Sequence, residues 1–264
     1  MAARIVRRQF DLVELTVIAV FVALCSWFLA RKIEPPVRIW WEYTSTREVA
    51  RLKAAYGPDH FSENQEEWAI RDFFQDQRNG FFVDVGANHY RDQSNTFYLD
   101  DRLGWSGIAI DPQRSFEADY QKHRPRTRFF PLFVSDVSNE TAKLYLVDRT
   151  SLAASNNRDY TQGFGKIVQT VVVPTITLTD LLTQLQVAKI DLLSVDVELS
   201  EPQLLAGFDI ERFRPRLVCI EAVPEVRQQI LNYFAKHDYV MVGAYLRVDV
   251  QNLYFIPLSA AEKR

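Results

Sequence analysis

FFVDVGANHYRDQS, residues 81–94, is the stretch that decides the fold. An apolar run ends at Asp84, Gly86 and Asn88, and the chain then turns polar. Asp, Gly and Asn form strands poorly and turns well, so the pattern predicts a buried strand that ends in a turn. Such a turn either reverses the chain or brings the backbone close to a ligand, and both interpretations stay open here.

Downstream, short apolar runs alternate with helix-like stretches, which predicts right-handed crossovers and a doubly wound, mostly parallel α/β sheet. Ligands of such sheets bind at the carboxyl ends of the strands. An amphipathic helix over residues 65–74 leads into the first strand. Further strands are expected at residues 107–111, 128–134, 190–195, 217–222, 239–245 and 252–257, and helices at 95–103, 115–123, 178–185, 201–205 and 226–237.

Two more strand-like runs, residues 142–147 and 169–176, flank a polar stretch at residues 148–166. That stretch is rich in Ser, Asn and Gly and is long for a plain connection in a compact domain. It is therefore a candidate lid or substrate loop, and an unstructured surface segment is the alternative.

The amino terminus resembles a membrane anchor. Residues 15–30 carry no charge, and counting from Leu12 gives nearly the roughly 20 apolar residues that a spanning helix needs. A cleaved signal peptide is the alternative, but the run ends in WFLARK without a small-residue cleavage site. We expect a retained transmembrane helix. Basic residues flank both of its ends, so charge does not fix its orientation.

The composition is that of a globular chain with one large domain and an appendage: 264 residues, 47% hydrophobic and 25% charged. The net charge of −3 shows no basic excess, so we expect no nucleic-acid partner. Two cysteines provide no disulfide framework and suit a reducing compartment. The expected divisions are an anchor (1–32), a juxtamembrane linker (33–60), the main domain (61–258) and a tail (259–264).

Carboxylates stand at the ends of four successive predicted strands: Asp84, Asp111, Asp136, and Asp196 with Glu198. Like charges gathered at one edge of a sheet cost free energy unless a positive or donor-rich group lies among them. A cationic ligand that carries hydroxyl groups satisfies this requirement. We assign the first three of these strand ends to such a ligand.

The spacing of Gly86 and Asp111, about 20 residues, is typical of an acidic residue that binds an adenosine ribose. A dinucleotide is disfavoured because Gly86 stands alone where G-x-G-x-x-G is needed. This speaks against a nicotinamide oxidoreductase or epimerase. S-adenosylmethionine fits better: the backbone of Gly86, Ala87 and Asn88 reaches its methionine end. Asp84 accepts from its ammonium, and Asp111 holds the ribose.

Five blocks in this order resemble those of the FkbM-type S-adenosylmethionine-dependent methyltransferases, over about residues 61–257. The resemblance implies the class I, Rossmann-like methyltransferase fold, a seven-stranded sheet whose final strand is antiparallel. It also implies, usually, O-methylation of a sugar or polyketide hydroxyl. The blocks are FFVDVGAN (81–88), GIAIDP (107–112), FVSDVS (133–138), VPTITLTDLL (173–182) and IDLLSVDVELSEPQLLAGF (190–208).

One block departs from the family pattern. Where the family usually has Asp-x-Glu-Gly, this chain has Asp196, Val197, Glu198 and Leu199. A bulky side chain thus replaces a conformationally permissive glycine. We expect a reshaped acceptor pocket.

Methyl transfer to a hydroxyl needs an in-line approach and a base for the proton. Asp196 and Glu198, two apart on an extended strand end, point to the same side and are the first candidates for proton removal and acceptor positioning. We assign no metal ligand. A divalent cation held by this pair, or capping of the following helix, is the alternative. His89 is a second candidate base and Glu221 a third.

The sequence thus predicts a methyltransferase that uses S-adenosylmethionine to methylate a hydroxyl group of a small-molecule or glycan acceptor. Because S-adenosylmethionine is made in the cytosol, we expect a single-pass membrane protein with its catalytic domain on the cytoplasmic side. The alternative is a membrane-tethered, non-catalytic binding or scaffold protein that keeps the fold. Demethylated cofactor accumulating with an acceptor distinguishes the two.

Overall fold

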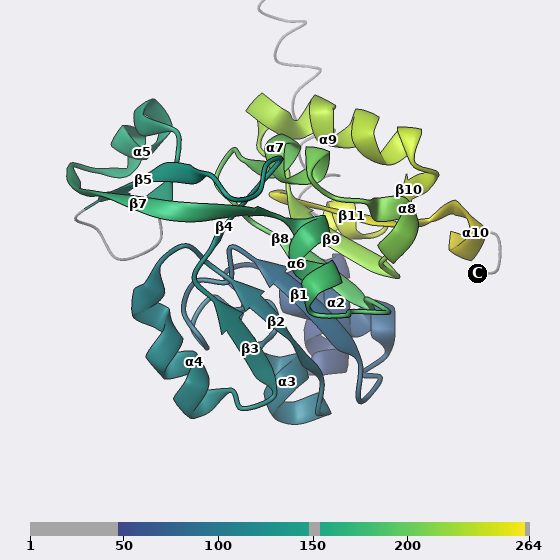
Figure 1. The fold of residues 1–264 in the computed structure, drawn as a ribbon. Helices are drawn as coiled ribbons and strands as arrows, with labels where there is room; N and C mark the ends of the chain where they lie inside the picture. Colours follow the sequence, from purple (N-terminus) through teal and green to yellow (C-terminus); the bar gives the residue numbers. More distant parts are fainter. Residues whose placement is uncertain (1–46, 148–153, 262–264) are drawn as a thin grey trace, which may run out of the picture. The chain divides into compact units, whose positions relative to one another are not determined.

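A seven-stranded sheet forms the centre of the protein, whose computed structural model describes residues 47–147 and 154–261 (Figure 1). In spatial order its strands are β3 (Thr127–Phe130), β2 (Ser106–Ile110), β1 (Phe81–Val85), β8 (Leu192–Val195), β9 (Leu217–Glu221), β11 (Asn252–Pro257) and β10 (Tyr239–Met241). Every neighbouring pair is parallel except the two that β11 makes. The predicted mostly parallel sheet with an antiparallel final strand is confirmed.

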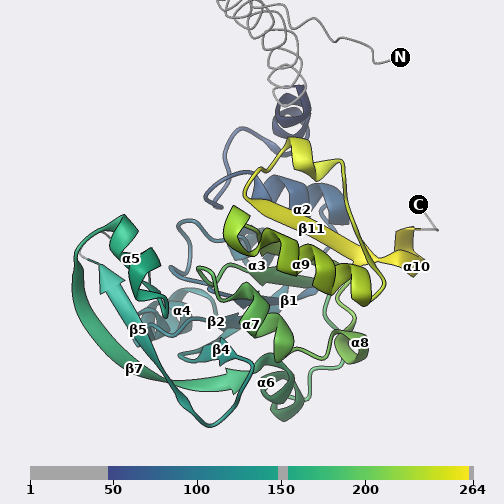
Figure 2. The ribbon, with the colours of Figure 1, turned by 90° about the horizontal axis from the view of Figure 1, so that it is seen from above.

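Helices cover both faces of this sheet (Figure 2). Side chains alternate along a strand, so Phe82 and Val83 of β1 point to opposite faces. Phe82 packs in a cluster with Phe73, and Val83 packs in another with Ile230. The Phe82 face carries α2 (Glu66–Phe74), α3 (Phe97–Leu103) and α4 (Glu117–His123), and the other face carries α6 (Leu178–Gln184), α7 (Glu201–Ala206), α8 (Ile210–Phe213) and α9 (Pro224–Lys236).

The sheet has its topological switch point at β1. The chain runs outward from β1 through β2 to β3, and later returns to place β8 on the opposite side of β1. Val85, at the end of β1, lies in register with Ile110 of β2 and with Val195 of β8. The segments that follow these three strands therefore meet at one edge, where α/β sheets bind ligands.

A second sheet of four strands extends from the first (Figure 1). The sequence predicted one strand over residues 128–134, but β3 ends at Phe130 and the next strand belongs to the second sheet. Pro131 lies at this break, and proline has no N–H group for a strand ladder. In spatial order the second sheet contains β4 (Phe133–Ser135), β7 (Ile167–Thr177), β5 (Thr141–Val147) and β6 (Ala154–Ser155), and α5 (Arg158–Phe164) follows β6.

Residues from Glu48 onward form one compact unit. Residues 48–60, which the sequence assigned to the linker, are part of it, and Leu52 packs with Trp68 and Val248. The predicted anchor, residues 1–32, lies outside the described residues. Within the described ranges, no helix has the length and apolar character that a membrane span requires.

Candidate functional site

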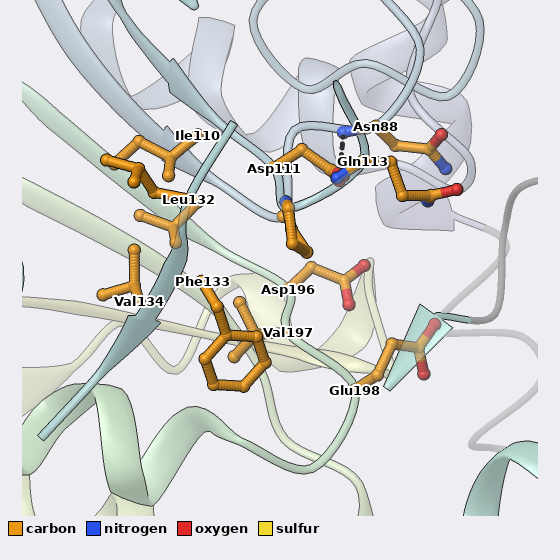
Figure 3. A pocket seen from close by; sticks show the side chains of 13 residues that line it. Asn88, Ile110, Asp111, Gln113, Leu132, Phe133, Val134, Asp196, Val197 and Glu198 are labelled. Carbon is orange, nitrogen blue, oxygen red and sulfur yellow. Dashed lines mark hydrogen bonds between the residues drawn. The ribbon is translucent and has the colours of Figure 1, made fainter. Parts of the chain in front are cut away.

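Two adjoining cavities lie at the carboxyl ends of β1, β2 and β8, and Figure 3 shows the residues that line the smaller one. The smaller, of about 70 Å³, has apolar walls around Asp111. The larger, of about 410 Å³, is lined mainly by polar and acidic side chains. Both cavities share Gly86, Asn88, Asp196 and Glu198, so a ligand in one contacts the walls of the other.

Gly86 stands where β1 and β8 approach each other most closely. Its φ is +81°, and a Cβ at this position would overlap the backbone carbonyl of Asp196. The Gly86 N–H donates to Ile110 O (2.9 Å), and the Asp196 N–H donates to Val85 O (2.9 Å). The glycine is therefore required by the packing of two strand ends, in addition to any approach of a ligand.

Asp111 joins the loops that follow β1 and β2. Its Oδ2 accepts the backbone N–H of Asn88 (3.1 Å), and its Oδ1 accepts that of Gln113 (2.8 Å). Burial raises the pKa of Asp111 to about 6, against the effect of these two hydrogen bonds. Each carboxylate oxygen has two acceptor positions, so both can still accept from a ribose hydroxyl.

Asn88 and Ala87 follow the glycine. Asn88 has a φ of +48°, and its Oδ1 is buried without a hydrogen-bond partner. Buried polar atoms are rarely left unpaired, so this oxygen marks a place for a ligand donor. The backbone of Ala87 is already used: its N–H donates to Ile110 O (3.1 Å), and its carbonyl accepts from the Tyr120 hydroxyl (3.1 Å).

Asp84 is buried and lines the larger cavity. Its Oδ2 accepts the hydroxyl of Thr96 (2.7 Å), which in turn accepts from the guanidinium of Arg124 (3.1 Å). Burial raises the pKa of Asp84, while the Thr96 hydrogen bond and the positive charge of Arg124 oppose the rise. This network holds Asp84 in position beneath the cavity.

Two predicted site residues lie outside the walls of both cavities. Asp136 is exposed at the end of β4, and hydrogen bonds from Gln203 (3.0 Å) and Ser135 (3.0 Å) lower its pKa. The break after β3 moves this strand end away from the others. His89 accepts the backbone N–H of Asp92 through Nδ1 (3.0 Å). The structure therefore does not bring Asp136 and His89 together with the other candidates.

Asp196 and Glu198, the predicted catalytic pair, line both cavities (Figure 3). Glu198 Oε2 accepts the hydroxyl of Tyr160 (2.8 Å), and Glu198 O accepts the hydroxyl of Ser155 (2.7 Å). These bonds connect the predicted loop to the site. Residues 148–153 of that loop lie outside the described residues. Tyr160 belongs to α5, and no sequence motif marked it.

Two further carboxylates join Asp196: Glu201, at the start of α7, and Glu221, at the end of β9. Burial of its inner side and the charges of Glu221 and Glu198 raise the pKa of Asp196, whose outer surface stays open to the cavity. Burial and the neighbouring acids raise the pKa of Glu221 to about 8 and that of Glu201 to about 7. From the sequence alone, Glu201 was marked only as the start of a helix.

The side chains that line the smaller cavity suit the adenosine part of S-adenosylmethionine in their chemistry. Ile110, Leu132 and Phe133 supply apolar walls for a base, and Asp111 supplies acceptors for ribose hydroxyls. The unpaired Oδ1 of Asn88 provides another acceptor. The adjoining polar cavity has room for the charged methionine part and for an acceptor. The residues present therefore suit this cofactor.

The model of the Methyltransferase FkbM domain matches residues 84–241. No curated protein matches. One similar solved structure is a TehB-like SAM-dependent methyltransferase from Corynebacterium glutamicum: 14% identity, 83% of this chain and 99% of that chain covered, TM-score 0.41. Another is a precorrin-6y C5,15-methyltransferase from Geobacter metallireducens: 10% identity, 75% and 90% covered, TM-score 0.36.

The family match spans more than half of the chain and includes the ends of β1, β2, β8 and β9, where the two cavities lie. It therefore covers the residues that suit the cofactor. The chain belongs to the FkbM methyltransferase family, and its cofactor is S-adenosylmethionine.

Proposed function

We propose that this methyltransferase methylates a hydroxyl group of a sugar, a glycan or another small polar acceptor. The observation that carries the proposal is the larger cavity beside the cofactor pocket, whose walls are rich in carboxylates and amides. Such groups pair with the hydroxyls of a polyhydroxylated molecule. Asn95, Gln251 and Asn252 contribute amides, and Phe164 adds an apolar surface.

The bound cofactor supplies a methyl group on a positively charged sulfur. Asp111 and Asn88 would hold the adenosine part of the cofactor, and the larger cavity beside them would take its other end. Glu221 forms a hydrogen bond with Asp196, and burial together with the neighbouring acids raises the pKa of both carboxyl groups, which suits this pair to accept a proton. This pair would take the proton of the acceptor hydroxyl as its oxygen bonds to the methyl carbon, while the bond from that carbon to sulfur breaks and neutral S-adenosylhomocysteine leaves.

Glu198 positions the acceptor in this scheme. Its Oε2 already accepts from the Tyr160 hydroxyl, so its orientation is fixed while the second oxygen stays available. Burial raises the pKa of Glu198, and the hydrogen bond from Tyr160 opposes that rise. Holding the acceptor close to the methyl group lowers the barrier by reducing the entropy that the reaction must lose.

The test is methyl transfer by the full-length protein in detergent, with hydroxyl, amine and carboxylate acceptors of similar size. We expect demethylated cofactor to accumulate with hydroxyl acceptors. Asp196→Asn should lower kcat on the order of a hundredfold or more, with cofactor affinity unchanged. Asp101→Asn, an exposed residue on α3, serves as the matched control. Cofactor binding without turnover on any acceptor would contradict the proposal and favour a scaffold.

We also propose that residues 1–32 anchor the protein and that the methyltransferase unit faces the cytosol. The uncharged run at residues 15–30 supports the anchor, and the cytosolic source of the cofactor supports the orientation. Membrane fractionation and a reporter fused after Arg264 test both points. A reporter that scores as extracytoplasmic would contradict the orientation.

A further inference from the structure

Three carboxylates from separate segments converge beside the larger cavity. Asp196 follows β8, Glu201 begins α7, and Glu221 ends β9. One oxygen of each lies within 4.8 Å of the corresponding oxygens of the other two. Asp196 and Glu221 also line the cavity, so this cluster can be reached from it.

Two oxygens of the cluster are buried and have no hydrogen-bond partner. The side chain of Glu201 is fully buried: its Oε1 accepts the N–H of Val197 (3.0 Å), which leaves Oε2 unpaired. The Oε2 of Glu221 is unpaired as well. Four buried side-chain atoms lack a partner in the described part of the chain, and these are two of them. Unpaired buried carboxylate oxygens are costly, so the cluster has unused capacity to bind a ligand.

The surroundings increase this cost. Glu63, Glu66 and Glu198 line the same cavity as Asp196 and Glu221. A bound cation would relieve the repulsion among these acids and would also use the unpaired oxygens.

We propose that Asp196, Glu201 and Glu221 bind a divalent cation of the hard, oxygen-ligated class. Three carboxylates suit Mg²⁺, Mn²⁺ or Ca²⁺ and lack the nitrogen and sulfur donors that zinc prefers. Oxygens on opposite sides of a cation lie roughly 4.1 Å apart for Mg²⁺ and about 4.8 Å apart for Ca²⁺. Since the three oxygens lie within 4.8 Å of one another, small movements of the side chains would bring them to the coordination distance of any of these ions.

The remaining coordination positions face the larger cavity, where water or an acceptor oxygen can occupy them. The proposal goes beyond the methyl-transfer function, because cation binding requires neither cofactor nor acceptor. Its test can therefore be read without turnover.

The experiment is a titration of Mn²⁺ into the full-length protein after treatment with a chelator. Electron paramagnetic resonance reports free Mn²⁺, and competition with Mg²⁺ and Ca²⁺ follows. We expect one bound ion with a dissociation constant below about 1 mM. Glu201→Gln and Glu221→Gln, which keep the side-chain shape, should each weaken binding by at least about tenfold. Glu225→Gln, an exposed residue on α9, is the matched control and should bind normally.

Thermal unfolding with and without Mn²⁺ shows whether each variant is folded. The ion should raise the melting temperature of the unaltered protein and of Glu225→Gln, but not that of Glu201→Gln. Cofactor titration on the same samples keeps the two proposals separate. Absence of Mn²⁺ binding in protein that binds S-adenosylmethionine would overturn the cation site alone. Equal affinity in the Glu201 and Glu221 variants would overturn the assignment of ligands.

Discussion

Leu199 has a backbone conformation that suits glycine. Its φ is +76°, and that of Glu198 before it is +54°. The left-handed region costs an L-residue roughly 1–2 kcal/mol. A leucine therefore occupies a backbone position that a glycine would adopt without strain, and its side chain packs against the core. The expected reshaping of the acceptor pocket stays a prediction.

This strain predicts an unusual order of stability. Leu199→Gly loses packing but relieves the strain, whereas Leu199→Ala loses packing and keeps it. We expect the glycine variant to be more stable by about 1 kcal/mol, as measured by urea unfolding. Leu185, with a φ of −83°, is the matched control, where alanine should be the more stable. An alanine variant at least as stable as the glycine variant at residue 199 would show that no strain is stored there.

Asp111 predicts how cofactor affinity depends on pH. The ionised carboxylate accepts from the backbone and from the ribose, whereas its protonated form must give up one acceptor position. Since the pKa of Asp111 is raised to about 6, affinity for S-adenosylmethionine should rise between pH 5 and pH 7 and then level off. Calorimetry measures it. Asp111→Asn should bind more weakly and show a flatter pH profile, and Asp101→Asn should behave like the unaltered protein.

The same residue has the opposite effect on folding stability. The pKa of Asp111 is 3.8 in the unfolded chain and about 6 in the folded protein. The folded state therefore binds the proton more tightly at pH values between these two. The stabilisation that Asp111 contributes to the free energy of unfolding is fully present below about pH 4 and is lost as the pH rises through 6. Urea unfolding from pH 4 to pH 7 checks the sign, and Asp111→Asn should remove this part of the slope.

At the scale of elements, a side-chain hydrogen bond from Tyr160 joins α5 to the wall of the larger cavity. Asn157 caps the helix by accepting the Tyr160 N–H (3.1 Å), and the Tyr160 hydroxyl donates to Glu198 (2.8 Å). Tyr160→Phe removes only the second bond. We expect faster hydrogen exchange across residues 158–164 and unchanged cofactor affinity. Tyr145→Phe on β5 is the control, and unchanged exchange in Tyr160→Phe would show that other contacts hold α5.

Arg124 connects α4 with α3. Its side chain is 1% exposed, and its guanidinium donates to Asp100 (3.1 Å) and to the carbonyl of Thr96 (3.0 Å). Removing it leaves Asp100 buried with fewer partners, so Arg124→Leu should lower the free energy of unfolding by about 3–5 kcal/mol. Urea unfolding measures this. Arg126 pairs with the same carboxylate but is half exposed, and Arg126→Leu should cost about 1 kcal/mol or less. Similar costs for both would contradict the argument from burial.

For the whole molecule, the parallel sheet could be predicted from its sequence because buried strands and amphipathic helices leave local patterns. Two strands of the second sheet, β5 and β7, were predicted from their apolar runs, but the pairing of β7 with β4 was not, because it joins residues about forty positions apart and leaves no periodic signal. The apolar run at residues 128–134 therefore looked like one strand, and Asp136 was placed with the wrong neighbours. Pro131 was the available signal of the break.

The part of the site that lies at strand ends was predictable from the sequence, and the part contributed by helices was not. Gly86, Asp111 and Asp196 follow strands, so their meeting at one sheet edge followed from the topology. Glu201 and Tyr160 lie in helices, and only the folded chain shows what their side chains contact. The carboxylate cluster thus needed the structure, since its members come from three segments.

The compact unit predicts the behaviour of a shortened chain. Residues from Glu48 onward contain both cavities and the packed sheet. A chain without residues 1–32 should therefore leave the membrane fraction and bind S-adenosylmethionine with unchanged affinity. Fractionation and calorimetry measure the two properties. Loss of affinity in a shortened chain that melts cooperatively would assign those residues a part in binding.

The contact between Gly86 and the Asp196 carbonyl also concerns how the family diverges. Every residue type has that carbonyl, so no substitution at position 196 can make room for a side chain at position 86. A descendant that had given up its cofactor would still keep the glycine, because its sheet would need it. Asn88 and Asp111 would no longer be under selection, and substitutions would accumulate at both positions. A relative that keeps Gly86 but lacks these two residues is therefore expected to be inactive.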